Sequence, residues 1–185
     1  MGVRNYLIEG VSGAGKTAVA TELQRRGHQV IHGDRQLAYR GDPETGLPMV
    51  PETGAPTAIR LSQNWIWDVD KVRAFIANQE AAVTFFCGGS RNFSKFIGLF
   101  DGVFVLEVDR DTMNRRIDQR VALDPTDFGG TPEERDLIER LYATKEDVPK
   151  NAVSIDATAP IVRVVDDILS KCREGDPGPA RQLRT

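Results

Sequence analysis

Residues 10 to 17 read Gly10-Val11-Ser12-Gly13-Ala14-Gly15-Lys16-Thr17 and satisfy the pattern G-x-x-x-x-G-K-[ST] at every position. They follow the apolar run 6–8 and precede a stretch with helical periodicity, 16–26. In that setting glycines let backbone amides converge on phosphate oxygens, and the helix N-terminus adds a partial positive charge. The segment predicts a P-loop in which Lys16 reaches the β and γ phosphates of ATP and the Thr17 hydroxyl binds Mg²⁺. The predicted nucleotide contacts are Gly13, Ala14, Gly15, Lys16, Thr17 and Ala18.

Short apolar runs and helical stretches alternate along the rest of the chain. The apolar runs end at Gly, Asp or Cys and are typical of strands buried on both faces: 6–8, 30–32, 83–86, 103–108 and 153–155. The stretches with helical periodicity are 16–26, 62–79, 92–100, 111–120, 132–145 and 160–172. This alternation predicts an α/β fold, with a five-stranded parallel sheet and helices on both faces.

The composition narrows the class of protein. The 185 residues suit one domain, and 24 Lys plus Arg against 27 Asp plus Glu argue against binding of a nucleic acid polymer. No apolar run approaches the roughly 20 residues of a membrane span, and the first ten residues lack the features of a signal peptide. The two cysteines, Cys87 and Cys172, match no metal-ligand spacing. We expect a cytoplasmic protein without membrane contact, with its oligomeric state open between monomer and homodimer.

Two other motifs resemble those of a GTPase. Asp127-Phe128-Gly129-Gly130 fits D-x-x-G, and Thr144-Lys145-Glu146-Asp147 fits a loosened guanine-recognition motif. Neither follows a predicted strand, and their short separation leaves no room for the intervening βα units. An AAA-type motor is disfavoured too, because no apolar strand ends in Asp-Glu and no second helical domain follows. A compact phosphotransferase remains.

Several segments resemble small-molecule kinases. The P-loop and the residues after it are similar to the opening of gluconate kinases, and the strand ending His32-Gly33-Asp34 resembles the second strand of gluconate and shikimate kinases. Cys87-Gly88-Gly89-Ser90-Arg91 resembles the glycine-rich turn of shikimate kinases, with Arg91 where nucleoside monophosphate kinases have a substrate arginine. Residues 154–160 resemble the adenine-contacting loop of adenylate kinases.

This resemblance covers residues 5–172 and implies a three-layer P-loop NTPase fold with strand order 2-3-1-4-5. It implies one kinase domain over residues 1–173, with an acceptor-binding region at 35–81 and a lid at 121–135. Residues 40–57, rich in Pro and Gly, would form a binding loop within that region. Residues 174–185 carry no core-forming pattern and are expected to form a flexible tail.

The resemblance also assigns roles to charged residues. Asp34 would take a proton from an acceptor hydroxyl or help to hold Mg²⁺, unless it is a helix N-cap or an ion-pair partner of Arg35. Arg116 would lie over adenine, near Ala157, and Arg120 would neutralise the transferring phosphoryl group. The alternative for both arginines is a solvated basic helix face.

The acceptor side is expected to involve the turn after the third strand. By resemblance the contacts there are Asp34, Gly88, Gly89 and Arg91. Further arginines, Arg35, Arg40 and Arg60, would suit an anionic or polyhydroxyl acceptor, although each is equally well a surface charge. Adenylate kinases place a metal-organising aspartate where this chain has Cys87, so the metal role moves to Thr17 and Asp34. Cys87 itself is expected to be a buried apolar residue.

Trp65 and Trp67 fall in the predicted helix 62–79, on different faces. We expect Trp67 in the core, whereas Trp65 either lines the acceptor pocket or is partly buried.

Together these features predict a kinase that moves the γ-phosphoryl group of Mg·ATP to a hydroxyl or phosphate of a small-molecule acceptor. The acceptor stays open between a nucleoside or nucleotide and a sugar acid or polyol. The alternative from another class is a regulatory module that binds ATP and signals through the state of its flap, without a small-molecule acceptor. Acceleration of ADP formation by a small acceptor distinguishes the two.

Overall fold

The computed structural model describes residues 4–50 and 56–174, and in that part of the chain a parallel sheet of five strands lies at the centre. The strands are β1 (Arg4–Glu9), β2 (Gln29–His32), β5 (Val83–Cys87), β6 (Gly102–Glu107) and β7 (Val153–Asp156). They pair in the order β2-β5-β1-β6-β7. These labels differ from the expected 2-3-1-4-5 because two unpredicted strands, β3 and β4, lie between β2 and β5 in the chain and form a sheet of their own.

The register of the sheet brings the chemically interesting segments to one edge. Ile8 in β1 and His32 in β2 are both paired with Cys87 in β5. Because all strands run in the same direction, their carboxyl ends meet at this edge, where ligands collect in open α/β sheets. The P-loop after β1, Asp34 after β2 and the turn 88–91 after β5 therefore lie together.

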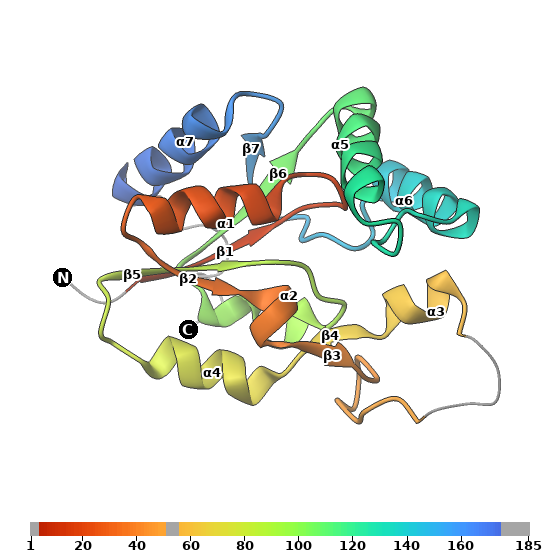
Figure 1. Ribbon diagram of the computed structural model, residues 1–185. Coiled ribbons are helices and arrows are strands. Elements are labelled where there is room, and N and C mark those ends of the chain that lie inside the picture. Colours follow the sequence, from red (N-terminus) through yellow and green to blue (C-terminus); the bar gives the residue numbers. More distant parts are fainter. Residues whose placement is uncertain (1–3, 51–55, 175–185) are drawn as a thin grey trace.

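Helices cover both faces of the sheet, as predicted. In Figure 1, α1 (Lys16–Arg25) and α7 (Ile161–Glu174) lie side by side on one face, and α4 (Val69–Ala77) lies on the other. The neighbouring β1 residues Leu7 and Ile8 are both fully buried, in core clusters on opposite sides of the sheet. Burial on both faces explains why the strands read as continuous apolar runs rather than as alternating patterns.

The prediction of one helix over residues 62–79 is wrong. The segment instead contains the end of α3 (Ala58–Gln63), then β4 (Trp65–Trp67), and then α4. Strand β4 pairs antiparallel with β3 (Ala38–Arg40), which follows the short helix α2 (Gly33–Gln36). The Trp67 amide donates to Ser90 Oγ and Asn92 Oδ1, and the Asp68 side chain accepts from two amides in the first turn of α4. Long-range pairing thus overrides the helical spacing of this segment.

Trp67 is fully buried, as expected, but the two tryptophans project from a strand and not from a helix. The predicted helix 92–100 is also absent from this part of the structure. Its place is taken by two 3₁₀ turns, η1 (Phe93–Lys95) and η2 (Ile97–Leu99), whose bonds close after three residues rather than four. Phe96 and Phe100 are both buried, which accounts for the helix-like spacing of apolar residues.

The predicted lid joins α5 (Arg110–Leu123) to α6 (Pro132–Thr144). A capping box formed by Thr131 and Glu134 starts α6, because each side chain bonds to the backbone of the other residue. Residues 51–55 of the predicted binding loop and residues 175–185 of the predicted tail lie outside the described residues. Among the helices that are described, none combines the length and apolar character needed to cross a membrane.

An ion-pair bridge ties α1 to α7 and gives a prediction about stability. Arg26 contacts Glu22 at 2.7 Å and Asp166 at 2.6 Å, and Arg25 also binds Glu22. These bonds from Arg25 and Arg26 lower the pKa of Glu22 to about 2 from its ordinary 4.5. The bridge therefore stabilises the fold fully above pH 4.5, and this contribution is lost as pH falls through 2.

Glu22→Gln should lower the melting temperature at pH 7 by a few degrees, because it removes the charge that pairs with Arg25 and Arg26. The difference from the unmodified protein should shrink as pH approaches 2. Thermal unfolding measured across this pH range checks the prediction. Glu80→Gln is the control, because Glu80 is exposed. An unchanged difference at low pH would contradict the assigned bridge.

Candidate active site

A cleft of about 760 Å³ opens at the carboxyl edge of the sheet, between the P-loop, α3, the turn 88–91 and the lid. The predicted site residues that line it are Gly13, Gly15, Lys16, Thr17, Ala18, Asp34, Gly89, Arg91, Arg116 and Arg120. Three predicted residues lie beside the cleft rather than on its walls: Ala14, Gly88 and Ala157. The structure therefore brings most of the sequence-predicted site together in one place.

The P-loop has a conformation that its glycines permit. Gly13 and Gly15 have φ values of 80° and 98°, in the left-handed region that side chains disfavour. A Cβ at Gly13 would also meet the Met113 carbonyl at 3.0 Å. Gly15 precedes α1 without a capping side chain, so the first amides of this helix are left for a ligand. Ala14 supports the loop from behind, since it is buried and its amide donates to the Val11 carbonyl.

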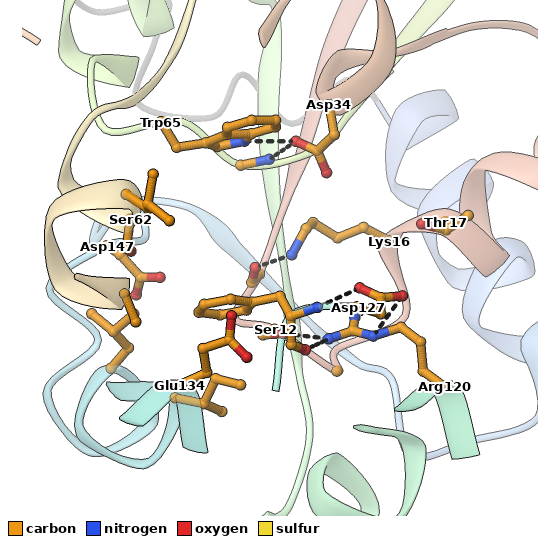
Figure 2. Close-up of a pocket in the computed structure, with 18 of the residues that line it drawn as sticks. Ser12, Lys16, Thr17, Asp34, Ser62, Trp65, Arg120, Asp127, Glu134 and Asp147 are labelled. Atoms are coloured by element: carbon orange, nitrogen blue, oxygen red, sulfur yellow. Dashed lines mark hydrogen bonds and ion pairs between the residues drawn. The ribbon is translucent and has the colours of Figure 1, made fainter. Parts of the chain in front are cut away.

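Lys16 extends from the start of α1 into the cleft, into the space between Asp34 and the lid (Figure 2). Its Nζ donates to the carbonyl oxygens of Gly10 and Val11, at 3.1 Å for Val11. These bonds hold the ammonium group over the loop. This position suits contact with the terminal phosphates of a bound nucleotide.

Asp34 lies in the first turn of α2 and faces the same cleft. Its Oδ1 accepts hydrogen bonds from Trp65 Nε1 and from the Gly89 amide, both at 3.3 Å. The residue is not the N-cap of α2, because that position belongs to His32. A Cβ at Gly88 would come within 2.9 Å of Asp34 Oδ1 and 2.7 Å of the Trp67 ring, so this glycine lets the turn pack against Asp34.

Arg116 and Arg120, both on α5, hold different parts of the cleft. Arg116 donates to the carbonyls of Ala14 at 3.1 Å and Ala157 at 2.7 Å, and so ties the P-loop to the loop after β7. Arg120 donates to Ser12 Oγ at 3.3 Å. The prediction of a solvated basic face is not met by these two side chains, since both line the cleft.

The predicted lid segment contacts Arg120. Its loop supplies Asp127, which pairs with Arg120 at 3.2 Å, and the Phe128 carbonyl, which accepts from the same guanidinium. Phe128 also packs against an apolar cluster of Ala58, Leu137 and Leu141, which joins α3 to α6. The segment that resembled a GTPase motif thus lies within the predicted lid. The predicted lid thus contacts both Arg120 on α5 and the apolar cluster that includes Ala58 of α3.

Arg91 reaches the cleft but already has partners within the protein. It pairs with Asp147 at 2.9 Å and donates to Ser62 Oγ at 2.6 Å and to the Ser62 carbonyl at 3.0 Å. Asp147 belongs to the second GTPase-like segment, and its side chain is only 10% exposed. The expected substrate arginine is therefore committed to an ion pair that sequence spacing does not reveal.

Glu9 is a cleft residue that the sequence analysis missed. It ends β1, directly before the P-loop, and is only 1% exposed. Both of its carboxyl oxygens are buried without a hydrogen-bond partner among the described residues. Burial raises the pKa of Glu9 well above its ordinary 4.5, the charge of Lys16 opposes this rise, and those of Asp34 and Asp147 add to it. The signal in the sequence is an acid directly after the apolar run 6–8.

The raised pKa of Glu9 has a consequence for stability that Glu9→Met tests. A carboxyl whose pKa is higher in the folded than in the unfolded protein costs stability as pH rises above 4.5. Methionine has a similar length and carries no charge, so the variant should melt at a higher temperature than the unmodified protein at pH 7.5. The gain should fade toward pH 4.5. A lower melting temperature at pH 7.5 would show that Glu9 is needed for the fold.

Cys87 is buried and burial raises the pKa of its thiol, so the group stays protonated at neutral pH. This matches the expectation of a small apolar residue.

The donor set of the cleft fits Mg²⁺ bound together with nucleotide phosphates. The Thr17 hydroxyl and the Asp34 carboxylate line the same cleft, and Mg²⁺ usually takes one or two protein oxygens along with phosphates and waters. In residues 4–50 and 56–174 there is no cluster of three or more acidic, histidine or cysteine side chains that would hold a metal alone.

Searches against protein-family models and against curated proteins gave no match. Solved structures are similar in fold. A gluconokinase from Sinorhizobium meliloti 1021 has 18% identity and a TM-score of 0.56, with 92% of each chain covered. A sugar kinase from Janibacter sp. has 17% identity and a TM-score of 0.55, with 95% of this chain and 96% of that chain covered.

A shikimate kinase from Acinetobacter baumannii, solved in complex with shikimate, has 16% identity and a TM-score of 0.56. The alignment covers 94% of this chain and 95% of that one. At such low identity these likenesses bear on the fold alone, and they agree with the resemblance that the P-loop and the segment around Asp34 suggested. The chain has the fold of the P-loop small-molecule kinases.

Proposed function

We propose that the protein is an ATP-dependent phosphotransferase that moves the γ-phosphoryl group of Mg·ATP to a hydroxyl or phosphate of a small-molecule acceptor. The observation that carries this proposal is the placement of Lys16 and Asp34 in one cleft. Lys16 belongs to a P-loop, and Asp34 lies beside a separate set of polar residues with room for a second ligand. A site for phosphoryl transfer needs these two halves, because the donor and the acceptor must meet in line.

The nucleotide half consists of the P-loop and α5. The amides around Gly13, Gly15 and Lys16 would hold the phosphates, and Thr17 with Asp34 would hold Mg²⁺, which neutralises charge on the phosphate oxygens when bound. Arg116 would position adenine against the loop containing Ala157, to which it is already bonded.

Arg120 would neutralise the phosphoryl group in transit. In the structure it is paired with Asp127 of the lid and bonded to Ser12. A lid that carries this pair gives the site a means of excluding water, which a kinase needs to avoid hydrolysis of ATP.

Asp34 would accept the proton of the acceptor hydroxyl. Because Trp65 and Gly89 donate to Oδ1, the orientation of the carboxylate is fixed and its second oxygen is left for the acceptor or for Mg²⁺. The acceptor classes in view are nucleosides or nucleotides and sugar acids or polyols. A cytoplasmic location, where ATP is abundant, belongs to this proposal.

The test is ADP release from Mg·ATP by the purified protein against a panel of nucleosides, nucleoside monophosphates, sugar acids, polyols and aminoglycosides. The proposal expects one acceptor class to raise turnover well above background hydrolysis. Binding of ATP without acceleration by any member would favour the regulatory ATP-binding module instead.

A further inference from the structure

The arginine side chains on the acceptor side of the cleft already contact other groups of the protein. The acceptor half of the cleft is the part lined by Glu9, Asp34, Ser62, Trp65, Arg91 and Asp147. All three guanidinium nitrogens of Arg91 face Ser62 or Asp147. Arg40 lies over the Trp65 ring, 4.4 Å from its centroid, and donates to the Leu61 carbonyl. Asp147 therefore balances the charge of Arg91, and contacts within the protein already hold both guanidinium groups.

The groups that lack partners on this side are carboxyl oxygens. Both oxygens of Glu9 and the Oδ1 of Asp147 are buried without a hydrogen bond among the described residues. A buried oxygen without a donor is costly, and folded proteins rarely retain one unless a ligand or water supplies the donor. Glu9 is the stronger case, because it lines the cleft, is 1% exposed and has two such oxygens.

Glu9 is also well placed to meet an acceptor. Its Oε2 lies 3.3 Å from the position that a Cβ on Gly89 would take, and the Gly89 amide donates to Asp34. Glu9 is close enough to Lys16, Asp34 and Asp147 for their charges to act on its carboxyl. An acceptor whose hydroxyl approaches Asp34, with Lys16 on the donor side, would bring its neighbouring groups toward Glu9.

We propose that Glu9 recognises the acceptor by accepting hydrogen bonds from its hydroxyl or amino groups, and that the acceptor is uncharged or cationic rather than a carboxylate or phosphate ester. This inference rests on the proposed phosphotransferase function and narrows it. An anionic group at this place would face Glu9 and Asp34, while the positive charge of Arg91 is already paired with Asp147. A polyol, nucleoside or amino sugar would instead supply the donors that Glu9 and Asp147 lack.

Matched pairs of ligands test the charge preference directly. Binding of uridine against uridine monophosphate, and of glucitol against gluconate, is measured by calorimetry with Mg²⁺ and a non-hydrolysable ATP analogue present. We expect the uncharged member of each pair to bind about tenfold or more tightly than its anionic partner. Tighter binding of the anionic member would overturn the proposal.

Variants at Glu9 test the residue itself. Glu9→Gln replaces one acceptor oxygen by a donor, so it should raise the KM and Kd of the acceptor about 10- to 100-fold while the Kd of the nucleotide stays unchanged. Glu9→Asp keeps the carboxylate but withdraws it, and should give a smaller loss. Exposed Glu80→Gln is the control. If Glu9→Gln keeps its melting temperature and binds the acceptor as well as the unmodified protein, the role of Glu9 is refuted.

The measurements of binding and of turnover distinguish failure of the charge preference from failure of the phosphotransferase function. Transfer of phosphoryl to an anionic acceptor would leave the phosphotransferase function intact and overturn the preference. Glu9-dependent binding of an uncharged or cationic compound without any transfer would support the recognition site and refute the kinase function.

Discussion

Lys16→Ala is expected to reduce acceptor-dependent turnover by about 10²- to 10³-fold, because it removes a preorganised charge from the place where phosphoryl charge develops. The Nζ of Lys16 contacts only the P-loop carbonyls of Gly10 and Val11 among the bonds that the structure describes for it. Loss of these bonds should change the melting temperature by a few degrees at most. The effect on turnover should thus far exceed the effect on stability.

The comparison uses steady-state ADP formation, thermal unfolding and nucleotide binding on the same preparations. Lys71→Ala is the matched control, because Lys71 is 61% exposed on α4 and does not line the cleft. An equal melting temperature combined with unchanged turnover in Lys16→Ala would remove this lysine from the proposed mechanism.

Asp34→Asn should have the second large effect, a loss in turnover of about 10²- to 10⁴-fold, which is typical of a general base. Asparagine has nearly the same shape and its oxygen still accepts from Trp65 Nε1 and the Gly89 amide, so the local structure is kept. It cannot take a proton from an acceptor hydroxyl, and it is a weaker Mg²⁺ ligand.

Turnover is measured at several Mg²⁺ concentrations to separate the two roles of Asp34. Partial recovery of turnover at high Mg²⁺ would show that Asp34 binds the metal. A loss of turnover at every Mg²⁺ concentration would show that Asp34 accepts the proton. Asp70→Asn is the control, because the Asp70 side chain is 92% exposed. A turnover within a factor of a few of the unmodified protein would show that Asp34 has neither role.

The parts of the fold predicted correctly depend on local sequence. The strands were visible as apolar runs because β1, β2, β5, β6 and β7 each sit between covering layers, and the P-loop was visible because its glycines and Lys16 follow a fixed pattern. The location of Asp34 followed from the same logic, since it comes directly after a strand at the carboxyl edge.

The parts that were wrong depend on contacts distant in sequence. The segment Trp65–Trp67 is a strand because β3 pairs with it and Ser90 and Asn92 bond to it, which no local period encodes. The partner of Arg91 is Asp147, in a segment interpreted only as a rejected GTPase motif. Because this pairing was hidden, the sequence left the acceptor open between an anionic and a polyhydroxyl compound.

The role of Glu9, at the centre of the site, could not be predicted from the sequence either. Its position directly before the P-loop was plain, but its meaning depends on burial by the surrounding elements and on the absence of a donor to its oxygens in the described residues. A charged residue at the end of an apolar strand is a signal only when the cleft that it faces is known.

The most direct measurement of the central claim follows the phosphoryl group itself. ATP carrying a labelled γ-phosphoryl group is incubated with the protein, Mg²⁺ and each candidate acceptor, and the products are separated. The account predicts that label appears on an uncharged or cationic hydroxyl compound, in equal amount to the ADP formed, and that Lys16→Ala slows this transfer by about 10²- to 10³-fold. Label found only in inorganic phosphate, whatever the acceptor, would contradict it.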